Sequence, residues 1–474
     1  MRRADVTGNT RKYHKTENGR AKKDEREAVL LALLSHGKNN TFSNVLVKRT
    51  LDDCGDMSQV ERAFIKRLLE GVIERRTKLD AVIARFTGKP AAKLHPAILQ
   101  ILRMGIYQIY YMDAVPDSAA CNEAVRLARR HAPARLSGFV NGVLRNVARE
   151  RAAGKKDTAL MQDDETRMRD LEESYSMPAW IIRMWEAELG KEQTKALLAS
   201  LLEIRPVCAR FCRPGSAGAA RGRLIHRLRA AGALVEEGRW LSDSFRLRRT
   251  SDLRKLPGFS EGLWTVQDES SMLAVTAAGL RGEETVFDVC AAPGGKTFLA
   301  AEKLLKGGGK VYAFDLTRRK TDRIREGAER LLLSNIVVQE RDARLVFPED
   351  EGKADVLLCD LPCSGLGVIG KKRDIKYRAS MEGILELQKL QREILRSAVR
   401  YLKKGGILIY STCTISSAEN EDNADWIEQT LGLQPEGVGP FLPADIPGIQ
   451  GNRLQLLPHI HGTDGFFMAR FRKI

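Results

Sequence analysis

The first third of the chain places apolar residues at helical spacing. Apolar side chains recur every three or four residues, as at Phe64, Leu68 and Val72, which is typical of a helix with one buried face. A further helix is predicted to begin at Pro96, because the first helical position tolerates a residue without an N–H. No alternating strand pattern interrupts residues 24–150. We therefore expect this region to form an all-helical module.

The segments around this module follow other patterns. Residues 1–23 are basic and lack apolar periodicity, so we expect a flexible arm. Residues 151–170 are polar and dense in charge, which favours a linker. Residues 171–270 begin with a helical pattern around Trp180 and Trp185 and continue as short strand-like pieces between glycine-rich turns. This part is predicted to be a helix followed by a small α+β unit.

Strand and helix patterns alternate over residues 271–474. Short apolar runs of the buried parallel-strand type occupy residues 285–290, 310–315, 335–340, 355–360 and 406–411. Helical patterns separate these runs, and the alternation predicts a doubly wound α/β domain. A last strand is predicted over residues 466–473.

The net charge adds a binding partner to this picture. The chain of 474 residues carries a net charge of +17. Residues 1–23 and 24–150 each carry +6, whereas residues 151–270 carry +3 and residues 271–474 carry +2. A basic balance of this kind favours nucleic acid over an anionic membrane surface, so we expect the first third to hold nucleic acid.

The apolar runs argue against membrane or secreted classes. None approaches the ~18 residues of a membrane span, and the N-terminal basic residues are followed by no apolar stretch of a secretory signal. Eight cysteines are too few for a disulfide scaffold in a chain of this length. We expect a cytoplasmic protein without membrane contact.

The first predicted strand of the α/β domain runs into the sequence DVCAAPGGKT. Gly294 and Gly295 allow a tight turn and close approach by a ligand, but their spacing matches neither GxGxxG nor a P-loop. Asp315 ends the next strand, where a carboxylate can accept hydrogen bonds from ribose hydroxyls. Asp342, after the third strand, is a candidate partner for an adenine amine. S-adenosylmethionine, a nucleoside without pyrophosphate, suits this arrangement, although both aspartates would also serve as strand-end caps.

Two cysteines and an aspartate follow the next two strands. Asp360 and Cys363 lie in CDLPCSG, and Cys413 lies in YSTCT. Because adjacent parallel strands open into one crevice at their carboxyl ends, we expect these residues to lie close together. A thiolate that adds to carbon 6 of cytosine makes carbon 5 nucleophilic toward a methyl sulfonium. Asp360 would hydrogen-bond ring nitrogen 3. One of the two thiols would be the nucleophile, and the other would assist release of the methylated base from the enzyme.

The remaining cysteines favour structural interpretations. The spacings of Cys208 with Cys212 and of Cys359 with Cys363 would allow a four-thiolate zinc site. Because Cys359 continues an apolar strand and alternation turns it away from the crevice, we expect no metal. Three further cysteines are expected to be buried and to pack as small hydrophobic side chains. They are Cys54, Cys121 and Cys290.

A cluster of cations follows the fourth predicted strand in GKKRDIKY. We expect it on the rim of the crevice, where it would contact phosphates beside an unstacked base. A solvated charged loop is the alternative interpretation. The cluster consists of Lys371, Lys372, Arg373 and Lys376.

In order and spacing, DVCAAPGGKT, DLPCSGLGVIGKKRDIKY and YSTCT resemble the motifs of the Sun/Fmu family of RNA cytosine-5 methyltransferases. VPDSAACNEAVRLARRHA and FVNGVLRNVARE resemble the NusB-like RNA-binding domain. The combination covers nearly the whole chain and resembles bacterial members that methylate 16S ribosomal RNA. It implies an all-α NusB-like module, a small α+β middle unit and a C-terminal Rossmann-like class I methyltransferase domain of α/β class.

The resemblance also implies roles for individual residues. Cys413 would be the nucleophile, Cys363 would promote release, and Asp360 would face both cofactor and base. The residues expected around S-adenosylmethionine are Cys290, Ala291, Ala292, Pro293, Gly294, Gly295, Lys296, Asp315, Asp342 and Asp360. VCARFCRPGS departs from the family's usual pattern, which leaves RNA contacts of the middle unit unassigned.

The predicted function is methylation of carbon 5 of a specific cytosine in 16S ribosomal RNA, through a covalent adduct with Cys413, by a monomer. One alternative makes Cys363 the nucleophile, as the Pro-Cys motif serves in DNA cytosine methyltransferases. A second alternative is an RNA-binding assembly or antitermination-like factor without catalysis.

Overall fold

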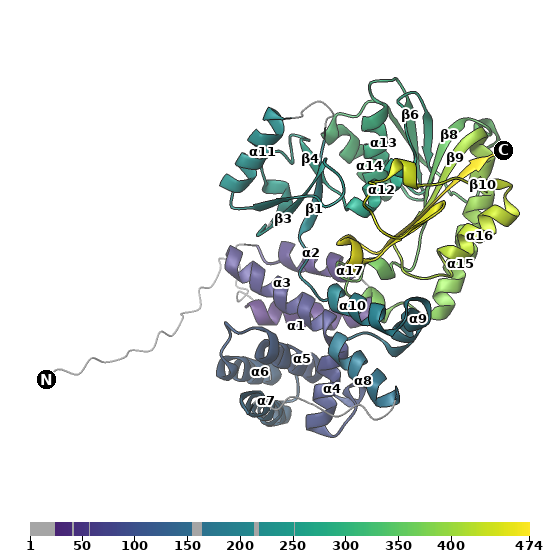
Figure 1. The fold of residues 1–474 in the computed structure, drawn as a ribbon. Helices are drawn as coiled ribbons and strands as arrows, with labels where there is room; N and C mark the ends of the chain where they lie inside the picture. Colours follow the sequence, from purple (N-terminus) through teal and green to yellow (C-terminus); the bar gives the residue numbers. More distant parts are fainter. Residues whose placement is uncertain (1–23, 40–41, 56, 154–163, 213–217, 251) are drawn as a thin grey trace. The chain divides into compact units, whose positions relative to one another are not determined.

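The computed structural model describes residues 24–39, 42–55, 57–153, 164–212, 218–250 and 252–474 (Figure 1). The arm expected at residues 1–23 lies outside the described residues, as do residues 154–163 of the expected linker. The chain divides into two compact units, with the boundary between Ser176 and Met177.

The N-terminal unit is helical, which confirms the predicted all-α module. Its α-helices are α1 (Glu25–Asn39), α2 (Ser43–Asp52), α3 (Gln59–Glu74), α4 (Arg76–Thr87), α5 (Pro96–Tyr111), α6 (Asp117–His131), α7 (Ser137–Ala152) and α8 (Asp164–Tyr175). Helix α5 packs against α1, α3, α4, α6 and α7, because it carries the most apolar face. Residues 164–170 form the start of α8 rather than a linker, since Met168 and Leu171 are buried at helical spacing.

The second unit begins with two helices and a small sheet. Its first elements are α9 (Ala179–Leu189), α10 (Lys191–Leu201), β1 (Val207–Phe211), α11 (Ala219–Ala230), β2 (Leu234–Glu237), β3 (Ser244–Arg248) and β4 (Trp264–Val266). The strands pair antiparallel in the order β2-β3-β1-β4. Phe245 and Trp264 pack with Leu224 and Leu228 of α11. The predicted α+β middle unit is confirmed.

A nine-stranded mixed sheet forms the rest of the second unit. Its elements are α12 (Glu269–Ala277), β5 (Thr285–Asp288), α13 (Gly295–Leu304), β6 (Lys310–Asp315), α14 (Arg318–Leu331), β7 (Ile336–Glu340), β8 (Ala354–Asp360), α15 (Met381–Ala398), β9 (Leu402–Thr412), α16 (Glu421–Thr430), β10 (Leu433–Pro435), β11 (Ile449–Gln450), β12 (Arg453–Leu456), α17 (Pro458–His461) and β13 (Phe466–Lys473). The order is β11-β12-β13-β9-β8-β5-β6-β7, with β10 paired to β13. Strands β5 to β9 are parallel and β13 is antiparallel to β9.

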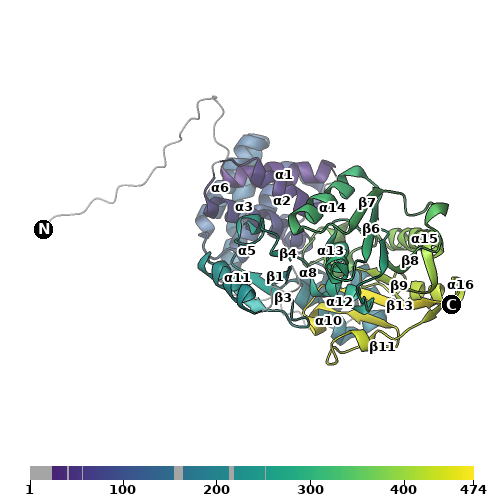
Figure 2. The same cartoon turned by 90° about the horizontal axis from the view of Figure 1, so that it is seen from above.

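Helices cover both faces of this sheet. Helices α12, α13 and α14 contribute to the core on one face, and α15 and α16 contribute to the core on the other. Figure 2 shows β6, β8 and β9 between α13 on one side and α15 on the other. The predicted doubly wound domain is therefore confirmed. The sequence did not predict β10, β11 and β12, which have only two to four residues each.

The middle sheet and the large sheet belong to one compact unit, Met177–Ile474, although the sequence suggested a boundary at residue 270. Buried polar contacts join them. Arg210 of β1 is 1% exposed and forms an ion pair with Glu302 of α13. Trp185 of α9 donates its Nε1–H to the carbonyl of Ile415 at 2.9 Å. No helix in the described ranges is long and apolar enough to cross a bilayer.

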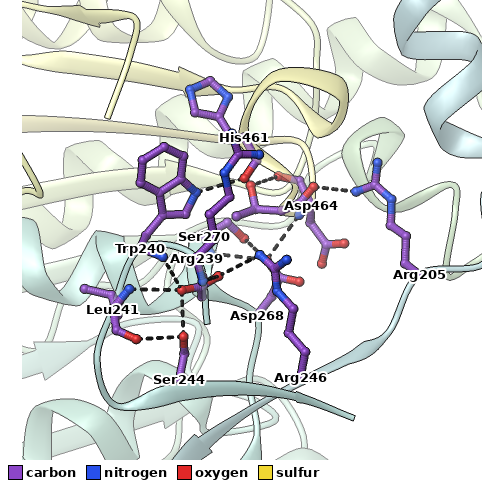
Figure 3. Close-up of polar contacts among 12 residues, drawn as sticks. Arg205, Arg239, Trp240, Leu241, Ser244, Arg246, Asp268, Ser270, His461 and Asp464 are labelled. Carbon is purple, nitrogen blue, oxygen red and sulfur yellow. Dashed lines mark hydrogen bonds and ion pairs between the residues drawn. The ribbon is translucent and has the colours of Figure 1, made fainter. Parts of the chain in front are cut away.

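Glu269, the first residue of α12, anchors a loop of the middle sheet. Its carboxylate is 1% exposed and accepts hydrogen bonds from the backbone N–H groups of Trp240 at 2.7 Å and Leu241 at 3.0 Å. The hydroxyl of Ser244 donates at 2.6 Å, and Arg246 forms an ion pair at 3.2 Å. Figure 3 shows these partners gathered around one point. A single buried carboxylate thus ties β3 and the loop before it to α12.

We predict that Glu269→Gln lowers the free energy of unfolding by about 2–4 kcal/mol. Hydrogen bonds to a charged group contribute about 1.5–3 kcal/mol each, and the substitution turns one acceptor oxygen toward several donors as an NH₂ group. Urea unfolding monitored by circular dichroism measures the change. Glu237→Gln is the matched control, because Glu237 is exposed on β2. Equal stability of the two variants would contradict the anchoring role.

Candidate active site

The carboxyl ends of β8 and β9 bring together the residues that carry the proposed chemistry. The two strands are neighbours in the parallel part of the sheet. The Sγ atoms of Cys363 and Cys413 lie 3.3 Å apart, within hydrogen-bond distance. The hydroxyl of Ser411 donates to Oδ1 of Asp360 at 3.1 Å. The structure therefore places Asp360, Cys363 and Cys413 at one edge of the sheet, as their positions after adjacent strands suggested.

The loop that carries Cys363 is held by buried side chains from two other segments. Gln391 of α15 donates its Nε2–H to the carbonyl of Pro362 at 2.8 Å. Glu419 accepts the N–H of Ser364 at 2.9 Å and a hydrogen bond from Gln391 at 3.0 Å. These contacts fix the backbone on both sides of Cys363, so its sulfur position does not depend on a flexible loop.

The backbone around Cys413 is held equally closely. The N–H of Gly367 donates to the carbonyl of Cys413 at 3.1 Å, and the N–H of Gly465 donates to the carbonyl of Gly367 at 2.9 Å. A Cβ atom at Gly367 would lie 1.9 Å from the carbonyl oxygen of Gly465. Only glycine fits at this position, which lets the loop after β8 lie directly against the loop after β9.

The contact between the two thiols separates their pKa values. The hydrogen bond with Cys363 lowers the pKa of Cys413, and the same contact raises the pKa of Cys363 well above its ordinary value. Burial and Asp360 oppose the thiolate of Cys413, whereas the charges of Lys372 and Lys296 favour it. Cys413 is therefore the sulfur that more readily exists as a thiolate, with Cys363 as its hydrogen-bond donor.

A cavity of about 170 Å³ lies at the carboxyl end of β5. It contains much of the predicted cofactor loop, together with Asp360 and residues around the start of α12 that the sequence did not single out. Its lining consists of Val266, Gln267, Asp268, Ser271, Asp288, Cys290, Ala291, Ala292, Pro293, Gly295, Lys296 and Asp360. The predicted loop residue Gly294 is not part of this lining.

Gly294 instead shapes the turn into α13. Its φ is +109°, a left-handed conformation that favours glycine. A Cβ atom there would lie 2.3 Å from the ring of Phe298. The residue is needed for the reversal from β5 into α13, and its part in cofactor binding stays a prediction.

An ion pair joins this cavity to the cysteine pair. Nζ of Lys296, in the first turn of α13, lies 2.7 Å from Oδ2 of Asp360. The other oxygen of Asp360 accepts the hydrogen bond of Ser411. Asp360 could therefore contact both a ligand in the cavity and a nucleobase placed beside the two sulfurs.

Two polar atoms in the cavity lining are buried and have no hydrogen-bond partner among the described residues. They are Oδ1 of Asp288 and Nε2 of Gln267. Oδ2 of Asp288 accepts a hydrogen bond from the hydroxyl of Thr297 at 2.6 Å, and burial raises the pKa of Asp288 to about 7. One unpartnered acceptor and one unpartnered donor fit a ligand that carries both a cation and an anion.

Both residues could have been found in the sequence by their position. Asp288 is the last residue of the first apolar strand of the α/β domain, and Gln267 opens the polar sequence QDESS between an apolar strand and an apolar helix. Asp288 is the first residue of DVCAAPGGKT, but that motif was interpreted through its glycines, and Gln267 belongs to no recognisable glycine or cysteine motif.

Two predicted cofactor ligands do not line the cavity. Asp315, at the end of β6, accepts the N–H of Ala292 at 2.9 Å and pairs with Lys320 at 2.8 Å. The first contact holds the backbone of the loop that lines the cavity. Asp342 forms an ion pair with Arg344 at 2.6 Å. The part of these aspartates in cofactor binding stays a prediction.

The predicted rim of four cations is wrong for Lys376, which is 1% exposed within a short buried turn. Lys371 is exposed, and its Nζ lies 2.7 Å from both Asp268 and Asp464. Its contact with phosphate stays a prediction. Figure 3 shows Asp268 and Asp464 close together, and the backbone N–H of Asp464 donates to Oδ1 of Asp268 at 3.1 Å. Lys372 is exposed and Arg373 is half-buried, so Lys372 is the clearest remaining candidate for phosphate contact.

The other cysteines lie away from the two sulfurs, and of these Cys290 lines the cavity. Cys359 lies in the core on the face of the sheet that carries α15 and α16, and burial raises its pKa. The residues Cys121, Cys208 and Cys212 are buried, whereas Cys54 and Cys290 are half-buried. Among the described residues, no group of three or more His, Cys, Asp or Glu side chains is arranged to hold a metal ion.

Comparison with known proteins gives the same two-part organisation. Residues 275–472 match the family model described as 16S rRNA methyltransferase RsmB/F, and residues 23–149 match the NusB family. The probable ribosomal RNA small subunit methyltransferase B of Bacillus subtilis is 35% identical over 452 residues, covering 94% of this chain and 98% of that protein. The Synechocystis protein of the same description is 33% identical, covering 94% and 99%. The crystal structure of PH0851 matches with a TM-score of 0.76 and 25% identity, covering 94% and 98%.

We predict that iodoacetamide labels Cys413 faster than Cys363 near neutral pH, because alkylation requires the thiolate. Cys363→Ala removes the hydrogen bond that lowers the pKa of Cys413, so the labelling rate of Cys413 should shift to higher pH. Peptide mass spectrometry after timed labelling measures both rates. Cys121→Ala, a buried cysteine of the N-terminal unit, should leave the profile unchanged. Faster labelling of Cys363, or no shift in Cys363→Ala, would contradict the assignment.

Proposed function

Because this chain belongs to the RsmB/F family of 16S rRNA methyltransferases, we propose that it methylates carbon 5 of a specific cytosine in 16S ribosomal RNA. The observation that carries this proposal is the contact of 3.3 Å between Cys363 and Cys413, at the sheet edge that also holds Asp360. A pair of thiols with separated pKa values suits a reaction in which one sulfur attacks a base and must later leave it.

The cavity supports S-adenosylmethionine as the methyl donor. The unpartnered oxygen of Asp288 suits the ammonium of an amino acid, and the loop residues Cys290 to Lys296 allow close approach of a nucleoside. When bound, this cofactor supplies a methyl group on a positively charged sulfur. Asp360, which lines the cavity and lies beside Ser411, would then be the side chain nearest to both cofactor and target base.

Cys413 performs the activating step in this proposal. Its thiolate forms a bond to carbon 6 of the cytosine, and the electron pair of the 5,6 double bond moves through the ring toward nitrogen 3. Asp360, paired with Lys296, would relay a proton from the Lys296 ammonium to that nitrogen. Carbon 5 then has the electron pair with which it takes up the methyl group.

Cys363 assists the release of the product. After methyl transfer, water accepts the proton of carbon 5, and the electron pair of that C–H bond re-forms the double bond as the bond between sulfur and carbon 6 breaks. The departing thiolate of Cys413 needs a hydrogen-bond donor, and the Cys363 thiol, whose pKa is raised by that contact, remains protonated to provide it.

The helical unit is proposed to hold the RNA. A depression on α6 and α7 is lined by Asn122, Val125, Arg126, Arg129, Arg130, Asn141 and Arg145. Arg126 and Arg130 form ion pairs within the unit, which leaves a mixed surface of fixed and exposed guanidinium groups suited to phosphates. This surface carries part of the positive charge of residues 24–150.

We predict that Cys413→Ala lowers methylation at least about 1,000-fold, as expected for loss of a nucleophile. Cys363→Ala should instead accumulate a covalent complex with RNA, because formation of the adduct is retained and its breakdown is slowed. Transfer of labelled methyl groups and denaturing gels measure the two effects. Cys54→Ala, in the helical unit, is the control and should resemble the unmodified protein.

The same variants distinguish the alternatives. A covalent complex that accumulates in Cys413→Ala would make Cys363 the nucleophile. If the labelled methyl group is found on an atom other than cytosine carbon 5, the proposed reaction is wrong.

A further inference from the structure

Gln267 is a buried polar side chain whose role the reaction above does not use. It lies between β4 and α12, is 5% exposed, and lines the cavity at the carboxyl end of β5. Its Nε2 atom is buried and has no hydrogen-bond partner among the described residues. A buried amide donor without a partner is costly, and its position in a cavity lining points to a ligand.

Arg210 determines which end of this amide faces the cavity. Its Nε–H donates to Oε1 of Gln267 at 2.9 Å. Because a guanidinium has only donors, the arrangement with the amide oxygen toward Arg210 is strongly favoured, and the NH₂ group turns the other way. Arg210 is itself 1% exposed and fixed by both oxygens of Glu302 on α13. The direction of the Gln267 donor is thus set by a buried ion pair.

The Gln267 amide lies against the start of α13. A Cβ atom at Gly295, the first residue of that ten-residue helix, would lie 3.6 Å from Nε2 of Gln267. The first N–H groups of a helix are not used within the helix, and its dipole favours an anion there. An oriented amide donor and a helix N-terminus therefore converge on one place in the cavity.

We propose that Gln267, positioned by Arg210, binds the α-carboxylate of the methionine part of S-adenosylmethionine at the N-terminus of α13. This inference rests on the proposed function, which supplies the cofactor. The unpartnered oxygen of Asp288 in the same cavity receives the ammonium, so the two orphaned atoms match the two charges of an α-amino acid. Arg210 lies on β1, and the small middle sheet thereby contributes to cofactor recognition.

Isothermal titration of the full chain with two ligands tests this assignment. One ligand is S-adenosylmethionine, and the other is its decarboxylated form, which keeps the ammonium and lacks the carboxylate. Gln267→Ala should weaken binding of S-adenosylmethionine by about 10- to 100-fold, the effect of losing a hydrogen bond to a charged group. Binding of the decarboxylated ligand should change by no more than about threefold.

Gln267→Glu serves as a second variant, because its carboxylate can still pair with Arg210 and keep the middle sheet in place. It turns an oxygen toward the bound carboxylate and should weaken S-adenosylmethionine at least as much as Gln267→Ala. Gln434→Ala, an exposed residue of β10, is the matched control. Thermal unfolding checks that each variant is folded.

The outcomes separate this inference from the proposed function. If Gln267→Ala weakens both ligands equally, or neither, the unmodified chain still binds S-adenosylmethionine and only the role of Gln267 is wrong. If the unmodified chain binds neither ligand, the proposed cofactor is wrong, and this inference fails with it.

Discussion

The ion pair between Lys296 and Asp360 joins the two halves of the site. Lys296 belongs to the first turn of α13 and is positioned by the loop that leaves β5, whereas Asp360 ends β8. On the other side, Asp360 accepts a hydrogen bond from Ser411 at the end of β9. Three strand ends are therefore linked through one carboxylate. This link requires β5, β8 and β9 to be consecutive neighbours in the parallel part of the sheet, as they are.

The surrounding elements keep this edge rigid. Glu419 and Gln391 hold the loop of Cys363, and the close approach of Gly367 to Gly465 holds the backbone of Cys413. The middle sheet reinforces the cavity through the buried pair of Arg210 with Glu302. These supports let two thiols lie within hydrogen-bond distance, and that contact separates their pKa values. The proposed function divides chemistry and RNA binding between the two units, a division suggested by the net charge, most of which lies outside residues 271–474.

Much of this organisation could be predicted from the sequence, because strand–helix alternation and two cysteines at strand ends are local signals. The strand at Phe466–Lys473 coincides with its predicted range. The linker predicted for residues 164–170 was wrong, because a polar, charged segment can still form a helix when two apolar residues are suitably spaced. Met168 and Leu171 are spaced in this way and are buried. The predicted exposure of Lys376 was wrong because tertiary neighbours, not local composition, decide whether a lysine is exposed. The pairing of Gln267 with Arg210 could not be predicted for the same reason, because it joins positions 57 residues apart.

The central claim is that Cys413 forms the covalent bond to the target cytosine. It is tested most directly with 16S ribosomal RNA in which 5-fluorocytidine replaces cytidine, incubated with the full chain and S-adenosylmethionine. Fluorine cannot leave carbon 5 as a proton does, so the adduct should persist. Mass spectrometry of the digested complex should then find the nucleotide on the peptide that contains Cys413. A nucleotide on Cys363, or methyl transfer without any protein-linked nucleotide, would contradict the account.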